Sequence, residues 1–208
     1  MPKDTFSNLP EEKKQRILEA AIDEFAEYSF ETASITRITE AAGIAKGSFY
    51  QYFDGKGDIF KHIFDISGIR KMEYMRHLLR DMDSLTFFEL FRQLYIAGIK
   101  FARDNPKLHA IADGFVKNAS PALKNEVLGK AIPKSNEFIE DLLTRGIGRK
   151  EIDPDIDVKL IAFILTSLSI TLSEYFIRDV KAEDDMEILV MVDKMLSMIE
   201  NGIKYKGE

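Results

Sequence analysis

The chain has 208 residues, of which 45% are hydrophobic and 31% charged, the composition of a globular protein with one large or two small domains. The lack of cysteine excludes disulfide bonds, thiolate metal sites and cysteine nucleophiles. The formal net charge of −6 argues mildly against a nucleic-acid partner, because such partners usually meet a basic surface.

Two observations argue against export or membrane insertion. The N-terminal segment MPKDTFSNLPEEKK has no apolar stretch of the kind found in a signal peptide. The longest run without charge, residues 160–173, is too short to cross a bilayer. We therefore expect a cytoplasmic protein with no membrane partner.

The first predicted helix begins at Pro10, which suits the first helical position, and runs to about Ser29. Two glutamates follow the proline at the positive end of the helix dipole. Helical spacing places four apolar residues on one stripe: Ile17, Ala21, Phe25 and Tyr28.

Residues 34–53 are predicted to form two short helices joined at a glycine. Ser34 can cap the first of them, and Ile35, Ile38 and Ala42 then share one face. Gly43 stands where the chain must leave the helix through a left-handed conformation, which costs glycine little.

The second short helix divides its side chains between two faces. Phe49 and Phe53, four residues apart, form an inward stripe. The remaining polar and aromatic residues point elsewhere: Lys46, Ser48, Tyr50, Gln51 and Tyr52. Such a division is typical of a helix-turn-helix, in which one face is buried and the other meets DNA. Tyr52 could also be a core residue, and Lys46 and Lys56 could be ordinary solvated lysines.

The rest of the chain is predicted to be helical, so the fold class is all-α with about nine helices. The first two predicted elements are a long helix from Lys56 to about Met82 and a helix capped by Ser84 and broken at Asn105-Pro106. A short helix follows through Leu108, Ile111, Ala112 and Phe115. The last three are a helix from Ser120 to Arg145 softened near Pro133 and two apolar helices over about 156–178 and 184–204. No pair of strands is indicated.

The last two helices are apolar around most of their circumference, and such helices need burial on all sides. Either they occupy the centre of their own domain or one face meets another subunit. The aromatic residues of this half likewise form either a plain core or, in part, the wall of a ligand cavity. The candidates for a cavity are Phe88, Phe91, Tyr95, Phe115, Phe138, Phe163 and Tyr175. A hydrophobic or amphipathic ligand is favoured, with Arg92, Lys100, Arg103 and Lys117 as possible partners for an acidic group.

No catalytic or metal-binding pattern is present in the sequence. His62, His77 and His109 are far apart without ligand spacing, and there is no phosphate-binding or dinucleotide-binding glycine motif. We expect no cofactor, no metal and no enzymatic activity.

Three stretches carry a resemblance to a known family. They are Ile17-Leu18-x-Ala20-Ala21-x-x-x-Phe25, then Ile38-x-x-Ala41-Ala42-Gly43-Ile44-x-Lys46-Gly47-Ser48-Phe49-Tyr50-x-Tyr52-Phe53, and Lys56-x-Asp58-Ile59-Phe60. With this spacing the chain resembles the tetracycline-repressor (TetR-type) transcription regulators. The resemblance implies a DNA-binding domain over residues 1–56, with the helix-turn-helix at 34–53, and a ligand-binding and dimerisation domain over 57–208.

The resemblance also implies functional residues. Residues 46–53 would form the recognition helix, and the DNA-contacting residues would be Thr36, Arg37, Lys46, Gly47, Ser48, Tyr50, Gln51, Tyr52 and Lys56. The family dimerises through a four-helix bundle of the last two helices of each subunit. It also holds an inducer between the helices of the second domain.

Three positions depart from the family pattern. Thr39 replaces a usual alanine where the two short helices cross, and its hydroxyl needs a partner. Ala45 replaces the serine that usually caps the recognition helix, a loss of roughly 1 kcal/mol. Gly55 replaces a serine before the fourth helix, although Asp58 remains to oppose the dipole.

Together with the residue patterns, the resemblance implies a homodimeric, ligand-responsive repressor that releases a pseudo-palindromic DNA operator when it binds a small hydrophobic or amphipathic molecule. The alternative is a helical small-molecule-binding or interaction module whose DNA-binding head does not function. The net acidity and the missing caps are the features that favour this alternative.

Overall fold

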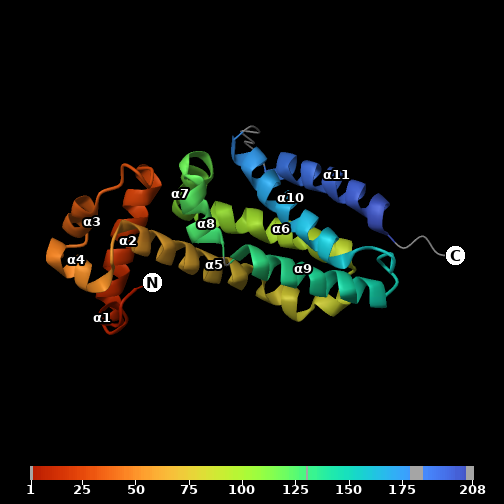
Figure 1. The fold of residues 1–208 in the computed structure, drawn as a ribbon, viewed down its shortest axis with the longest axis horizontal. Helices are drawn as coiled ribbons and strands as arrows, with labels where there is room; N and C mark the ends of the chain where they lie inside the picture. Colours follow the sequence, from red (N-terminus) through yellow and green to blue (C-terminus); the bar gives the residue numbers. More distant parts are fainter. Residues whose placement is uncertain (1, 130, 179–184, 205–208) are drawn as a thin grey trace. The chain divides into compact units, whose positions relative to one another are not determined.

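The computed structural model describes residues 2–129, 131–178 and 185–204, and these residues form helices joined by short connections (Figure 1). Among them are eleven α-helices and one short 3-10 helix, η1, Met82–Ser84. An isolated β-bridge between Ile152 and Lys204 is their only strand-like pairing. The predicted all-α class is confirmed.

The chain divides into two compact units, one of residues 1–72 with 102–127 and one of residues 73–101 with 128–208. The first unit contains α1 Asp4–Ser7, α2 Glu11–Glu27, α3 Ile35–Ala41, α4 Lys46–Tyr52, the start of α5 Lys56–Arg80, α7 Pro106–Asn118 and most of α8 Pro121–Leu128. The second contains the end of α5, most of α6 Phe87–Asp104, and α9 Ala131–Gly148, α10 Val158–Arg178 and α11 Asp185–Ile203. A functional boundary after residue 56 remains a prediction.

The core of the first unit is built from the apolar stripes that the sequence displays. Its largest fully buried side chains are Ile17, Ile38, Phe49, Phe53, Ile59 and Ile63. An aromatic chain continues this core: the ring centroids of Phe25 and Phe60 lie 4.9 Å apart, and those of Phe64 and Phe115 lie 4.8 Å apart. Each buried side chain of this size contributes about 1.5–3 kcal/mol, which holds α2, α5 and α7 together.

The second unit has a separate core. Five helices supply it, with Leu78 from the end of α5, Phe87, Leu90 and Phe91 from α6, Leu142 and Leu143 from α9, Ala162 and Leu165 from α10, and Val192, Leu196 and Ile199 from α11. Two polar contacts accompany the packing. The hydroxyls of Tyr95 and Ser169 lie 2.8 Å apart, and Arg92 Nε donates to Asp193 Oδ1 at 2.6 Å.

Several predicted helix ends differ from those observed. Pro10 is the N-cap of α2 and not its first helical residue. Ser84 does not cap the next helix, because it ends η1 and its hydroxyl donates to the carbonyl of Asp81. Thr86 takes that place: its backbone amide donates to Glu89 Oε2 at 2.9 Å, and its hydroxyl accepts from the Glu89 amide at 3.3 Å. This reciprocal pairing is a capping box.

Two differences explain why about nine helices were expected and eleven are observed. The sequence pattern missed α1, which is only one turn long. The single helix predicted from Ser120 to Arg145 is two helices, α8 and α9, and the break precedes Pro133. The break predicted at Asn105-Pro106 is confirmed, since α6 ends at Asp104 and α7 begins at Pro106. None of the helices in the described residues is long and apolar enough to cross a membrane.

Candidate nucleic-acid interface

The turn between α3 and α4 has the geometry of a helix-turn-helix. The Ser34 hydroxyl accepts from the amide of Arg37, as a capping serine should. Gly43 has a φ of +64°, so the predicted left-handed exit from α3 is confirmed. No side chain caps α4, since its N-cap residue is Ala45.

One face of the two helices is fully packed. Ile38, Phe49 and Phe53 have no exposed surface, and Ala42 is buried as well. Thr39 is also buried, and its hydroxyl donates to the carbonyl of Thr36 at 2.9 Å. The additional polar group at this crossing is therefore satisfied within its own helix.

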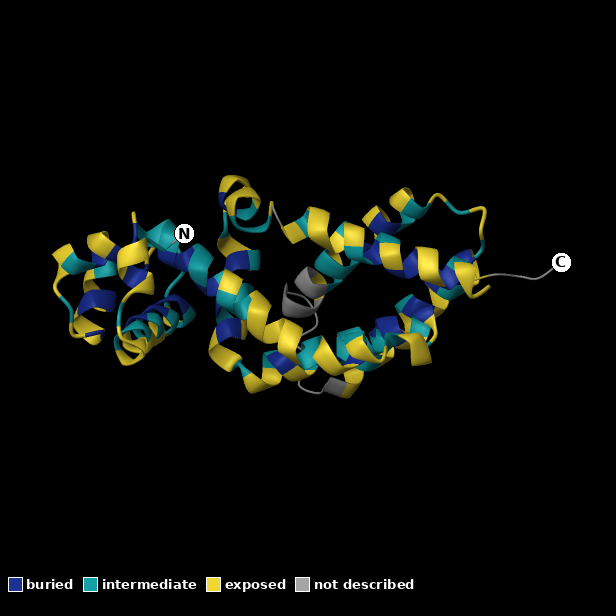
Figure 2. Ribbon diagram, turned by 90° about the horizontal axis from the view of Figure 1, so that it is seen from below, coloured by how far each residue is buried: buried dark blue, intermediate teal, exposed yellow. Residues whose placement is uncertain are grey.

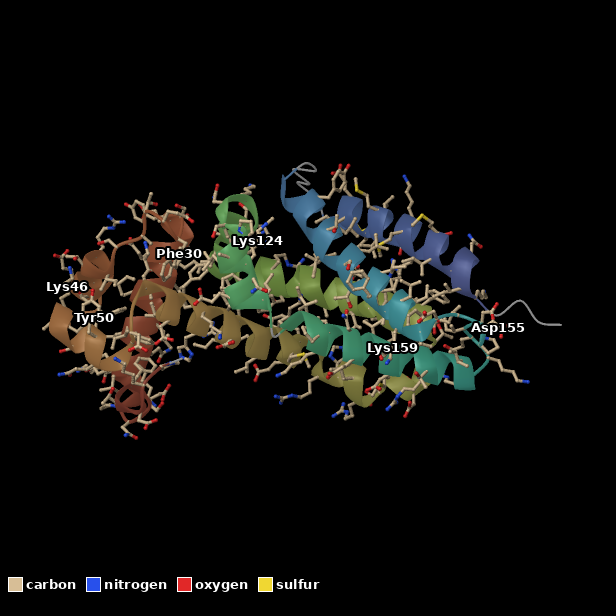
Figure 3. All side chains as sticks on the ribbon, viewed as in Figure 1. Phe30, Lys46, Tyr50, Lys124, Asp155 and Lys159 are labelled. Carbon is tan, nitrogen blue, oxygen red and sulfur yellow. The ribbon has the colours of Figure 1, made fainter. Side chains whose placement is uncertain are left out.

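The opposite face is exposed and carries most of the predicted DNA-binding residues. Thr36, Lys46, Gly47 and Gln51 are exposed, and the Tyr50 side chain is 46% exposed. Figure 3 shows Lys46 and Tyr50 on α4. Lys46 Nζ donates to the Thr36 hydroxyl at 3.1 Å, which brings one residue from each helix together. The two helices thus present one continuous polar surface.

Ser48 and Tyr52 are placed differently from the residues around them. Ser48 is half-buried, and Tyr52 is only 5% exposed. The Tyr52 ring lies against Phe6, with ring centroids 6.2 Å apart. The side chain of Tyr52 therefore belongs to the core and not to the exposed face of α4, and its contact with DNA stays a prediction. Its spacing, three residues after Phe49, allows this position, and the contact with Phe6 decides it.

Arg37, another predicted DNA-binding residue, is held by a partner within the protein. Its Nε lies 3.0 and 2.9 Å from the two carboxylate oxygens of Glu24, and one Nη donates to the carbonyl of Thr32 at 3.0 Å. Its guanidinium carbon lies 4.1 Å from the centre of the Tyr28 ring. The backbone amide of Ser34 donates to the same Glu24 carboxylate at 2.6 Å. Glu24 thus ties the start of α3 to α2.

Opposing effects act on the pKa of Glu24. Its burial acts to raise the pKa, because burial disfavours the charged form. The hydrogen bonds from Arg37 and Ser34 and the positive charges of Arg37 and Lys56 act the other way and prevail. The net effect lowers the pKa of Glu24, so the carboxylate is charged at neutral pH.

Lys56 also makes contacts within the protein. Its Nζ donates to the carbonyls of Glu31 and Ala33, each at 3.0 Å, and lies 4.9 Å from the centre of the Phe30 ring. Lys56 therefore fastens the connection between α2 and α3 to the start of α5. A smaller cap supports this start, where Asp58 Oδ2 accepts from the amide of Asp54 at 3.2 Å.

The residues predicted to line a ligand cavity do not share one environment. In the second unit, Phe91 is buried, Phe88, Tyr95 and Phe138 are partly buried against the core, and Phe163 and Tyr175 are exposed. Phe115 belongs to the first unit, where it packs on Phe60 and Phe64. The grouping of these seven residues into one cavity stays a prediction.

Three of the predicted ligand-facing cations have acidic partners within the protein. Arg92 pairs with Asp193 at 2.6 Å, Lys117 with Asp113 at 2.8 Å, and Arg103 with Asp104 at 3.8 Å. Among the described residues there is no group of three or more histidine, aspartate or glutamate side chains that could hold a metal ion.

Comparisons with known proteins give this geometry a family context. Residues 17–63, which include α3 and α4, match the family model described as "Bacterial regulatory proteins, tetR family". A "Fatty acid metabolism regulator protein" of Bacillus subtilis (strain 168) is 21% identical over 195 residues, 93% of this chain and 97% of that relative.

Solved structures agree with this match. A TetR family transcriptional regulator from Chloroflexus aurantiacus J-10-fl is 28% identical and has a TM-score of 0.66, over 98% of this chain and 99% of that one. FadR of Bacillus subtilis, solved in complex with stearoyl-CoA, is 19% identical with a TM-score of 0.68, over 91% of this chain and 98% of that one. At this lower identity the likeness concerns the fold alone.

Proposed function

Because the chain belongs to the TetR family of transcriptional regulators, we propose that it is a repressor that binds a pseudo-palindromic operator as a homodimer and releases it on binding a small molecule. The recognition helix would be α4. The observation that carries the proposal is the division of α3 and α4 into a buried stripe and an exposed face with Thr36, Lys46 and Tyr50.

The exposed face of α4 suits a DNA major groove. Gln51 offers an amide that can pair with a base edge, Lys46 offers a positive charge, and Tyr50 offers a hydroxyl and an apolar ring. Arg37 and Lys56 would support this face from behind, because their cationic groups already bind Glu24 and two backbone carbonyls. Because Arg37 and Lys56 bind groups of the protein, fewer cations are left for phosphate contacts, so each subunit alone should bind DNA with modest affinity.

A homodimer would supply the affinity that one head lacks. Apolar side chains are exposed along α10 and α11: Leu160, Phe163, Ile164, Tyr175, Met186, Val190 and Met198. Figure 2 colours the helices by burial and shows exposed and buried residues alternating along them. On α10 the exposed set follows helical spacing, so it forms one face that a second copy can cover.

The effector is proposed to be a hydrophobic or amphipathic molecule bound by the second domain. The aromatic residues of α6, together with Phe138 of α9, support an apolar site, and bundles of helices commonly hold small ligands between their helices. The structural relative FadR of Bacillus subtilis was solved with stearoyl-CoA, so a long-chain acyl-CoA is the first probe to test. Such a ligand would release DNA only if it binds better to the state that does not fit the operator.

The DNA-binding step can be tested by selecting operators from random duplex DNA with the purified protein. We expect enrichment of a two-fold symmetric site, and an affinity for it that falls steeply with salt. Lys46→Ala and Tyr50→Ala should each weaken specific binding about tenfold while the melting temperature stays the same. Enrichment of no sequence would reject the proposal.

The release step needs a separate measurement. Stearoyl-CoA, with coenzyme A as the control, would be titrated into a preformed complex with the selected operator. We expect the acylated compound to weaken operator binding at least tenfold, and operator to weaken its binding by the same factor. Equal affinity for stearoyl-CoA with and without operator would exclude this class of effector.

A further inference from the structure

The recognition helix is short and poorly capped at its start. It has only seven residues, and Ala45 gives it no side-chain cap. A helix leaves its last four carbonyls without partners in the helix, and one this short is unstable alone in water. Its orientation therefore depends on the packing of its buried face and on the groups that bind its two ends.

Residues 3–6, which we call the N-terminal clasp, bind the last turn of α4. The backbone amide of Lys3 donates to the carbonyl of Tyr52 at 2.9 Å, and Lys3 Nζ donates to the carbonyl of Tyr50 at 2.9 Å. The Thr5 hydroxyl donates to the carbonyl of Gln51. One short segment near the N-terminus thus binds three successive backbone carbonyls of α4, those of Tyr50, Gln51 and Tyr52.

Charge and packing strengthen this contact. The Lys3 ammonium also lies 2.7 Å from Asp54, the second residue after α4, and lowers the pKa of that carboxyl. A positive charge is favourable at this end of a helix because the backbone dipoles leave it partly negative. Phe6, 4% exposed, anchors the clasp in the core, where its ring centroid lies 4.8 Å from that of Phe53.

We propose that Lys3 and Thr5 are positioning residues for operator recognition, because they hold the C-terminal turn of α4 and so set the angle of its DNA-facing side chains. This inference rests on the proposed function of α4 as the recognition helix. The clasp would act on DNA through α4 and not by touching it.

Two variants separate positioning from direct DNA contact. Thr5→Val removes one hydroxyl without changing charge or shape, and Lys3→Met removes the ammonium but keeps the apolar stem. In the full-length protein without DNA, we expect amide hydrogen exchange in α4 to become roughly three- to tenfold faster, the range that the loss of one or two hydrogen bonds implies. Exchange in α2 should not change, which shows that the unit stays folded.

The same variants should bind the selected operator more weakly by a similar factor, with an unchanged dependence on salt. Ser7→Ala and Lys14→Met are the matched controls, since Ser7 is exposed on α1 and Lys14 pairs with Glu11 on its own helix. Neither control should alter exchange in α4.

Failure of this positioning role and failure of the proposed function would give different results. Unchanged exchange in α4 in both variants would overturn the positioning role, whatever the DNA affinity. Weaker binding of Lys3→Met with a shallower salt dependence and unchanged exchange would assign Lys3 to a phosphate contact, which also overturns it. If the wild-type protein selects no operator, the proposed function fails, and the exchange measurement still decides whether the clasp holds α4.

Discussion

At the scale of single residues, one buried carboxylate, that of Glu24, ties the start of α3 to α2. The Glu24 side chain is 6% exposed and receives hydrogen bonds from the Arg37 guanidinium and the Ser34 amide. A buried charge is tolerated only when its hydrogen-bonding capacity is used, and both partners here lie at the start of α3. Glu24 therefore fixes where the motif begins.

Glu24→Gln should reduce the free energy of unfolding by about 2 kcal/mol, because a neutral amide pairs less well with Arg37 and Ser34. The loss stays below that of a fully buried ion pair, since the Arg37 side chain is 45% exposed. Denaturation in urea measures the change. Asp23→Asn is the control: its partner Lys107 is largely exposed, so the cost should be below about 0.5 kcal/mol.

The same carboxylate makes a prediction about pH. The folded state lowers the pKa of Glu24, so its stabilising effect is present at neutral pH and is lost as the pH falls through the lowered pKa. The difference in stability between wild type and Glu24→Gln should therefore shrink as acid is added. A constant difference from pH 7 to pH 3 would contradict this role.

At the scale of elements, the turn between α3 and α4 is decided by local signals. Ser34 caps α3, Gly43 supplies the left-handed exit, and the apolar residues repeat at helical intervals. These signals act over a few residues, so they can be read from the sequence. The start of α6 was mispredicted because two residues, Ser84 and Thr86, can each cap a helix. A local signal distinguishes them, since only Thr86 has a glutamate, Glu89, three residues later.

Two glycines of this element should respond oppositely to the same substitution. Gly43→Ala should lower the free energy of unfolding by about 1–2 kcal/mol, because its φ of +64° is unfavourable for a residue with a side chain. An added methyl group would meet no neighbouring atom, so the backbone conformation alone would cause the loss. Gly47→Ala lies inside α4 with equally open space, and it should be neutral or stabilise by up to about 1 kcal/mol. Thermal unfolding of both variants tests this contrast. Equal changes in melting temperature would show that the left-handed conformation at residue 43 does not require glycine.

At the scale of the whole molecule, α10 and α11 carry more apolar surface than one copy buries. Val192, Leu196 and Ile199 are in the core, whereas Val190 and Met198 of the same helix are 49% and 65% exposed. Exposed apolar residues of this kind are what the proposed dimer would cover. A second copy satisfies this need and also matches the symmetry of the proposed operator.

Phe163→Glu should raise the dissociation constant of the proposed dimer at least tenfold, because a two-fold interface would bury the new charge twice. Sedimentation across a range of concentrations measures the effect. Ile69→Glu is the control, since Ile69 is 65% exposed on α5, outside the proposed interface, and its substitution should leave the dimer intact. A monomeric wild-type protein at micromolar concentration would reject the dimer.

The sequence alone determined the all-α class, the position of α3 and α4 and the division of α4 into two faces, because helical spacing, caps and turn glycines act between neighbours in the chain. Only the tertiary structure decided that Arg37 and Lys56 bind groups of the protein, that Tyr52 is buried and that residues 3–6 clasp α4. Lys3 and Tyr50 are 47 residues apart, and Arg37 and Glu24 are 13 apart. Whether a polar side chain in such a pair meets water, DNA or the protein depends on which chain segments the packed core brings together.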